Sequence, residues 1–80
     1  MALRLKIVSP ERKEFEGEVT SVKVPGLMGE FEVLNNHAPI VSVLQKGNVV
    51  YECADGRHEL AVSAGVMSVK RNQVNVCVEL

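Results

Sequence analysis

The sequence lacks long apolar runs and a large excess of either charge, and it is poor in aromatic residues. It has no Trp, two Phe and one Tyr, which is poor material for an aromatic-lined ligand site. No apolar stretch approaches the roughly 18 residues that cross a bilayer as a helix, so we expect membrane association only through other proteins. Nine basic and ten acidic residues give a net charge of −1, which predicts no nucleic-acid binding.

Cysteine is scarce, and its spacing matches no common motif. Cys53 and Cys77 lie in strand-like segments. The first eight residues contain two basic side chains and no small-residue cleavage site, which argues against a secretory signal, so we expect reduced, half-buried thiols. A structural zinc site would also need His37 and His58, and no CxxC or HxxxH spacing supports one. We therefore expect no metal and no other cofactor.

The short chain limits the protein to one core. Eighty residues with 46% apolar content predict a single domain over residues 1–80. A domain of this size usually nets only about 3–5 kcal/mol from its core. Burial against a partner is therefore a reasonable part of its working state.

Apolar and polar residues alternate along much of the chain, and helix signals are nearly absent. In the opening segment, apolar residues at positions 3, 5 and 7 alternate with Arg4 and Lys6. This period of two is typical of a strand with one buried face, and turn residues recur at intervals of about eight to twelve positions. The sequence predicts an all-β fold, a small antiparallel β-sandwich of about eight to ten short strands.

Three segments carry finer predictions. The apolar phase changes within residues 15–24, which requires a bulge or a break near Thr20-Ser21. Ile40–Leu44 is apolar at four of five positions, as expected of a strand covered on both faces. Asp55-Gly56 predicts a hairpin with a type I′ turn, because that turn needs positive φ at two residues.

No arrangement typical of catalysis is visible. None of the serines lies in a GxSxG motif, and no spacing supports a thiol–imidazole pair of His37 with Cys53 or Cys77. The turn at residues 26–29 is not followed by a predicted helix, so it does not predict a phosphate loop. Glu30 lies between the turn glycine at position 29 and Phe31, which places its carboxylate at a loop tip where a partner could reach it.

Several short blocks occur in an order and spacing that are distinctive together. They are Ile7-Val8-Ser9-Pro10-Glu11, Phe15-Glu16-Gly17-Glu18-Val19, Val24-Pro25-Gly26, Gly29-Glu30-Phe31, His37-Ala38-Pro39 and Ser63-Ala64-Gly65-Val66 followed by Val69. Through essentially all of its residues, the chain resembles the N-terminal domain of the F-type ATP synthase ε subunit. That family usually has Pro-Gly where this chain has Asn35-Asn36, and Ser-Gly-Gly where it has Ser63-Ala64-Gly65.

The resemblance implies a non-catalytic subunit of the rotor, or central stalk, which links the γ subunit to the c-ring and couples ion flow to ATP synthesis. The loop that meets the c-ring is matched by Gly29, Glu30 and Phe31. Positions at or near the γ subunit are matched by Ser9, His37 and Ser42. The resemblance also implies peripheral attachment, through the complex, at the cytoplasmic face of the bacterial inner membrane.

Many family members continue into a C-terminal two-helix domain that can inhibit ATP hydrolysis and sometimes binds ATP. This sequence stops at Leu80, either as a naturally short form or as part of a longer chain. The resemblance therefore implies the coupling role with the two-helix domain absent and with no ATP binding. The alternative is a free-standing β-sandwich binding module for a peptide or small polar ligand, and a cysteine-dependent enzyme ranks third.

Overall fold

The computed structural model describes residues 3–35 and 38–80, and every regular element in them is a strand. In chain order these are β1 (Leu3–Val8), β2 (Lys13–Val19), β3 (Ser21–Gly26), β4 (Gly29–Val33), β5 (Ile40–Leu44), β6 (Gly47–Cys53), β7 (Gly56–Val62), β8 (Ala64–Lys70) and β9 (Gln73–Glu79). The prediction of an all-β fold with about eight to ten strands is confirmed. No helix in the described residues has the length and hydropathy needed to cross a membrane.

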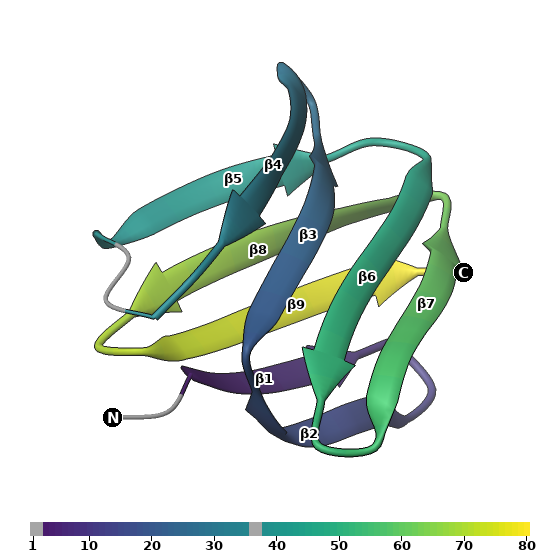
Figure 1. Ribbon diagram of the computed structural model, residues 1–80. Coiled ribbons are helices and arrows are strands. Elements are labelled where there is room, and N and C mark those ends of the chain that lie inside the picture. The colour runs from purple at the N-terminus through teal and green to yellow at the C-terminus, as the bar shows by residue number, and fades with distance from the viewer. Residues whose placement is uncertain (1–2, 36–37) are drawn as a thin grey trace.

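The strands form one sheet that curls over to make two packed layers (Figure 1). One layer has the order β2-β1-β9-β8-β5, and the other contains β4, β3, β6 and β7. The layers join at a corner where β3 meets β5 through the single residue pair Gly26 and Leu44. The predicted β-sandwich is confirmed, and its strand pairs are antiparallel except for β1 and β9, which run parallel.

Alternation along the strands sends every second side chain into the space between the layers. Leu5, Ile7 and Val76 are fully buried, whereas Lys6 and Cys77, their neighbours in sequence, face outward. The period-two pattern predicted this division, because successive residues of a strand point to opposite faces of the sheet. The two layers therefore share one continuous apolar core.

The predicted break in the second strand region is also present. β2 ends at Val19 and β3 begins at Ser21, with a bend at Thr20 between them. The amide of Thr20 donates a hydrogen bond to the carbonyl oxygen of Glu52 at 2.8 Å, so the bend is held against β6. Val19 and Val22 both reach the core because the bend resets the phase.

The predicted type I′ turn is wrong, although the hairpin itself is correct. Between β6 and β7 the turn residues are Ala54 and Asp55, and only the following Gly56 has positive φ, at 125°. Two successive positive φ values occur instead at Arg71 (52°) and Asn72 (59°), between β8 and β9. Asn tolerates this region well because its short polar side chain can bond locally.

The prediction that Ile40–Leu44 is covered on both faces is wrong as well. Leu44 is buried, but Val41 and Val43 are 73% and 54% exposed. The described residues place no second layer over the outer face of β5. The apolar composition of this strand therefore reflects an uncovered surface as well as a core face.

Candidate functional site

The β3–β4 hairpin carries the three residues that the resemblance assigns to the c-ring. Its tip projects beyond the rest of the sandwich, at the top of Figure 1. Gly26 pairs with Gly29 across the turn, and Gly29 has φ of 129°, a value that residues with a side chain rarely adopt. Leu27 and Met28, between the two glycines, are 61% and 98% exposed.

Glu30 lies one residue beyond the tip, in β4, and not at the tip itself. Its Oε1 is 3.2 Å from Nζ of Lys23 on the neighbouring strand, and both side chains are about half exposed. Exposed pairs of this kind contribute about 0–1 kcal/mol to folding. The carboxylate is therefore available to a partner, with its charge partly balanced by Lys23.

Phe31 differs from its two neighbours because its ring is half-buried. It faces inward beside Val24 and packs against the core. A Cβ atom added to Gly26 would lie only 2.8 Å from this ring, so Phe31 supports the hairpin from below. Leu27 and Met28 are more exposed than Phe31. In the sequence they are recognisable as an apolar pair between two turn glycines.

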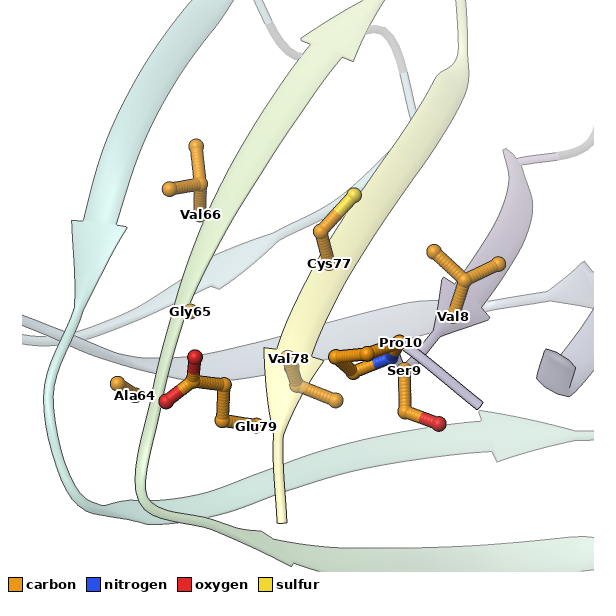
Figure 2. A pocket seen from close by; sticks show the side chains of 9 residues that line it. All are labelled: Val8, Ser9, Pro10, Ala64, Gly65, Val66, Cys77, Val78 and Glu79. Carbon is orange, nitrogen blue, oxygen red and sulfur yellow. The ribbon is translucent and has the colours of Figure 1, made fainter. Parts of the chain in front are cut away.

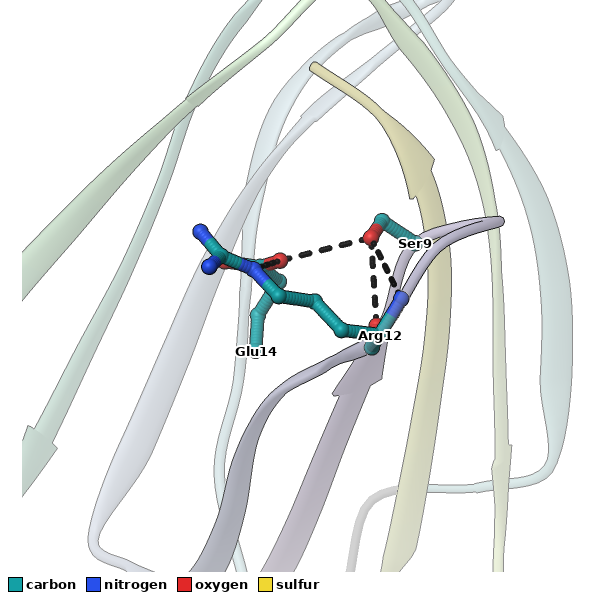
Figure 3. Close-up of polar contacts among 3 residues, drawn as sticks. All are labelled: Ser9, Arg12 and Glu14. Atoms are coloured by element: carbon teal, nitrogen blue, oxygen red, sulfur yellow. Dashed lines mark hydrogen bonds and ion pairs between the residues drawn. The ribbon is translucent and has the colours of Figure 1, made fainter.

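Ser9 closes the turn between β1 and β2, as Figure 3 shows. Its hydroxyl oxygen lies 3.1 Å from the carbonyl oxygen of Arg12 and 3.3 Å from Oε2 of Glu14, and it accepts a hydrogen bond from the Arg12 amide. Glu14 also accepts a hydrogen bond from Nε of Arg12 at 2.8 Å, which raises the pKa of that guanidinium. The side chain of Ser9 is thus already engaged in shaping the turn.

The other two residues assigned to γ lie elsewhere. Ser42 is a half-buried residue of β5, with its hydroxyl 3.4 Å from the carbonyl oxygen of Val43. His37 and the neighbouring Asn36 lie outside the described residues. Strands β9 and β8 separate β1 from β5, so Ser9 and Ser42 do not form one compact cluster.

An apolar row, which we define as Val8, Cys77, Val66 and Val43, crosses the outer face from β1 to β5, whereas the Ser42 side chain points to the inner face. Its members are successive cross-strand neighbours on β1, β9, β8 and β5. Figure 2 shows Val8, Cys77 and Val66 lining a groove of about 500 Å³. Val8 adjoins Ser9 in sequence, and Val43 adjoins Ser42.

Cys77 is exposed, so the prediction of a half-buried thiol is wrong for it and correct only for Cys53.

A third group, which the sequence did not predict, lies at the β6–β7 turn. Asp55 Oδ1 accepts a hydrogen bond from Cys53 Sγ at 2.7 Å and lies 3.0 Å from Nε2 of His58. The bond to Asp55 raises the pKa of the Cys53 thiol. The bonds from Cys53 and then His58 lower the pKa of the Asp55 carboxyl. A thiol held protonated by a carboxylate is a poor nucleophile, which disfavours a cysteine-dependent enzyme at this site.

Comparison with known sequences identifies the family. Residues 2–80 match the family described as "ATP synthase, Delta/Epsilon chain, beta-sandwich domain". The ATP synthase epsilon chain of Nitratiruptor sp. is 42% identical over 78 residues, covering 96% of this chain and 60% of the relative. The epsilon chain of Wolinella succinogenes is 43% identical over 75 residues, covering 92% and 57%. The chain thus spans less than two thirds of these relatives' length.

Solved structures share the fold at lower identity. A chain of the Euglena gracilis mitochondrial ATP synthase, in a structure of its OSCP, F1 and c-ring, superposes with a TM-score of 0.89 at 20% identity, covering 96% of this chain and 50% of that one. A chain of the Tetrahymena thermophila mitochondrial ATP synthase central stalk and c-ring gives 0.84 at 11% identity, covering 100% and 65%. With the family match running from residue 2 to residue 80, the chain belongs to the β-sandwich domain family of ATP synthase delta and epsilon chains.

Proposed function

We propose that this domain is a non-catalytic part of the central stalk of an F-type ATP synthase, where it links the γ subunit to the c-ring and couples ion flow to ATP synthesis. Membership of the delta/epsilon family supports this role. The observation that carries it is the presence of two separate exposed apolar surfaces on one sandwich, the apolar row and the β3–β4 tip. A link between two partners needs two such surfaces.

The shared core suits this mechanical role. Residues of both layers interlock in one apolar cluster, and close-packed protein interiors deform little under load. A torque that enters at the β3–β4 tip would reach the outer face of the other layer with small elastic loss. We accordingly treat residues 1–80 as one domain that works as a rigid connector.

The apolar row is the proposed contact with γ, with Ser9 at one end, the β5 backbone at Ser42 at the other, and His37 as a third contact. Val43 and Val66 are each about half exposed. Because complete burial of a Val side chain stabilises by about 1.5–3 kcal/mol, covering the exposed half of each contributes about 1 kcal/mol. The uncovered face of β5 is thereby explained as an interface.

The β3–β4 tip is the proposed contact with the c-ring. Gly29 gives the tip its shape, Phe31 supports it, and Glu30 offers a carboxylate beside it. Leu27 and Met28 add the apolar part of the contact, and a Met side chain adapts well to an irregular surface. In this arrangement the domain is held peripherally at the cytoplasmic face of the bacterial inner membrane, through the complex alone.

The substitution Val66→Asp tests the γ contact, and Val50→Asp is its control. Val50 lies on the outer face of the other layer, opposite Lys23 and Glu59. Val66→Asp should weaken binding to purified γ subunit by at least about tenfold, because it removes apolar contact and buries a carboxylate. Val50→Asp should bind as the wild type does. Equal binding by the Val66 variant, or equal loss by both variants, would show that the apolar row does not contact γ.

A further inference from the structure

The β6–β7 turn brings together three side chains of the types that bind transition metals. Cys53 Sγ, Asp55 Oδ1 and His58 Nε2 all lie within 4.8 Å of one another. From this geometry we propose that Cys53, Asp55 and His58 bind a divalent zinc-like metal ion, with a fourth position left for water. The proposal concerns a site apart from the two surfaces described above, and it does not depend on the proposed function.

The separations fit a tetrahedral ion after a small adjustment. With metal–ligand bonds of about 2.0–2.3 Å, the ligand atoms of a tetrahedral zinc site lie about 3.3–3.8 Å apart. Asp55 Oδ1 is 2.7 Å from the sulfur and 3.0 Å from the imidazole nitrogen. All three ligand atoms lie within 4.8 Å of one another. An ion is therefore accommodated when this oxygen moves outward by less than about 1 Å and rotation of the Cys53 side chain brings Sγ to about 3.6 Å from Nε2. The side chain of Asp55 is 75% exposed, so its outward movement meets little resistance.

The hairpin places the other two ligands on one face. Tyr51 and His58 face each other across β6 and β7, and their rings stack with centroids 5.4 Å apart. Tyr51 also contacts the ring of Phe15 at 4.5 Å. Cys53 follows Tyr51 by two residues and therefore points to the same face of the strand. The stacking fixes the imidazole with its Nε2 toward Asp55.

The mixture of ligand types selects the metal. Thiolate and imidazole suit Zn²⁺ and neighbouring transition metals, whereas Mg²⁺ and Ca²⁺ favour sites built of oxygen ligands alone. Binding requires the Cys53 thiol to release its proton to solvent, since the thiolate is the ligand. Figure 1 places the β6–β7 turn at the opposite end of its layer from the β3–β4 tip. A bound ion would therefore leave the proposed c-ring contact free.

Cobalt titration of the chelator-treated 80-residue chain tests the proposal. Co²⁺ should bind one ion per chain and give a sulfur-to-metal charge-transfer band together with the visible bands of a tetrahedral site. Zn²⁺ should then displace it and abolish both signals. Cys53→Ser should remove the charge-transfer band, whereas Cys77→Ser, the matched control, should leave it unchanged.

Two further variants separate ligation from folding. His58→Phe keeps an aromatic ring against Tyr51 but removes the nitrogen, and Asp55→Asn keeps the shape of the side chain. Each should weaken Co²⁺ binding by at least about tenfold, because even partners that only support metal ligands cost about 10–100-fold when removed. Circular dichroism should show both variants folded. The proposal is overturned if the wild-type chain gives no charge-transfer band, if the band depends on Cys77, or if a folded His58→Phe chain binds Co²⁺ as tightly as the wild type.

Discussion

Reversing the charge of Glu30 distinguishes attachment to the c-ring from folding. In the isolated domain, Glu30→Arg breaks the 3.2 Å pair with Lys23 and sets two cations side by side. An exposed pair contributes about 0–1 kcal/mol, and like-charge repulsion at such a site is of similar size. For a domain of this length, about 1 kcal/mol shifts Tm by about 4–8 °C. The variant should therefore remain folded at 25 °C.

The effect on attachment should be larger if the proposed c-ring contact pairs the Glu30 carboxylate with a basic group. Two charges about 4 Å apart interact by about 1 kcal/mol in water, so changing attraction to repulsion costs about 1–2 kcal/mol. This corresponds to roughly a five- to thirtyfold weaker Kd. Added salt should narrow the difference between wild type and variant, since the Debye length falls from about 10 Å at 0.1 M to about 3 Å at 1 M.

The assay compares binding to purified c-ring with proton-driven ATP synthesis on the same membranes. Glu32→Arg is the matched control: it makes the same charge change opposite Lys23, farther along β4 from the tip. The double variant that combines Lys23→Glu with Glu30→Arg restores the internal ion pair, so it should recover stability without recovering attachment to the c-ring. The reasoning is refuted if Glu30→Arg leaves both attachment and coupling unchanged, or if Glu32→Arg weakens them as much.

Two other predictions concern stability. Gly29→Ala should destabilise the chain by about 1–3 kcal/mol, because the φ of 129° at this position strains any residue with a side chain. The added methyl itself meets nothing within 4 Å. An unchanged urea midpoint would contradict this prediction. In the presence of chelator, Asp55→Asn should lower Tm at neutral pH, because the hydrogen bonds from Cys53 and His58 hold the pKa of the Asp55 carboxyl below its ordinary value of 3.8. That stabilisation is present above pH 3.8 and is lost as pH falls through the lowered pKa. The Tm values of the wild type and of Asp55→Asn should therefore converge in acid. A Tm difference that persists there would show that the Asp55 carboxylate is not the cause.

The strands and the core could be predicted because they depend on local alternation. Leu5 and Ile7 are buried, as their alternation with polar residues predicted. The bend at Thr20 shifts the alternation of inward and outward side chains by one residue, as the apolar pattern required. The turn types were harder to predict. Asp55-Gly56 matched the composition of a type I′ turn, but the register of β6 and β7 pairs Cys53 with Gly56, so Gly56 falls in the strand and the turn moves back by one residue.

The candidate sites depended on contacts that sequence spacing does not encode. Cys53, Asp55 and His58 follow no zinc-finger spacing, so their positions in the sequence did not predict that they lie together. A cross-strand pair, Tyr51 with His58, is what brings the imidazole back to the turn. Glu30 was expected at a loop tip, and its ion pair with Lys23 depends on the register of β3 and β4, which the sequence left open.

The outer face of β5 is exposed although the sequence predicted that it would be covered, because apolar composition alone does not show what covers a strand. A strand buried on both faces and a strand that packs on one face while awaiting a partner on the other have the same apolar sequence. In the isolated domain, Val41 and Val43 remain in contact with water, which leaves part of the apolar content of a small chain without a stabilising role. A domain whose core alone nets about 3–5 kcal/mol gains about 2 kcal/mol more when these two residues are covered, because each contributes about 1 kcal/mol on burial. The stability of this domain and its attachment to a partner therefore draw on the same set of apolar residues, and the gain on binding should appear as a higher Tm in the presence of the γ subunit.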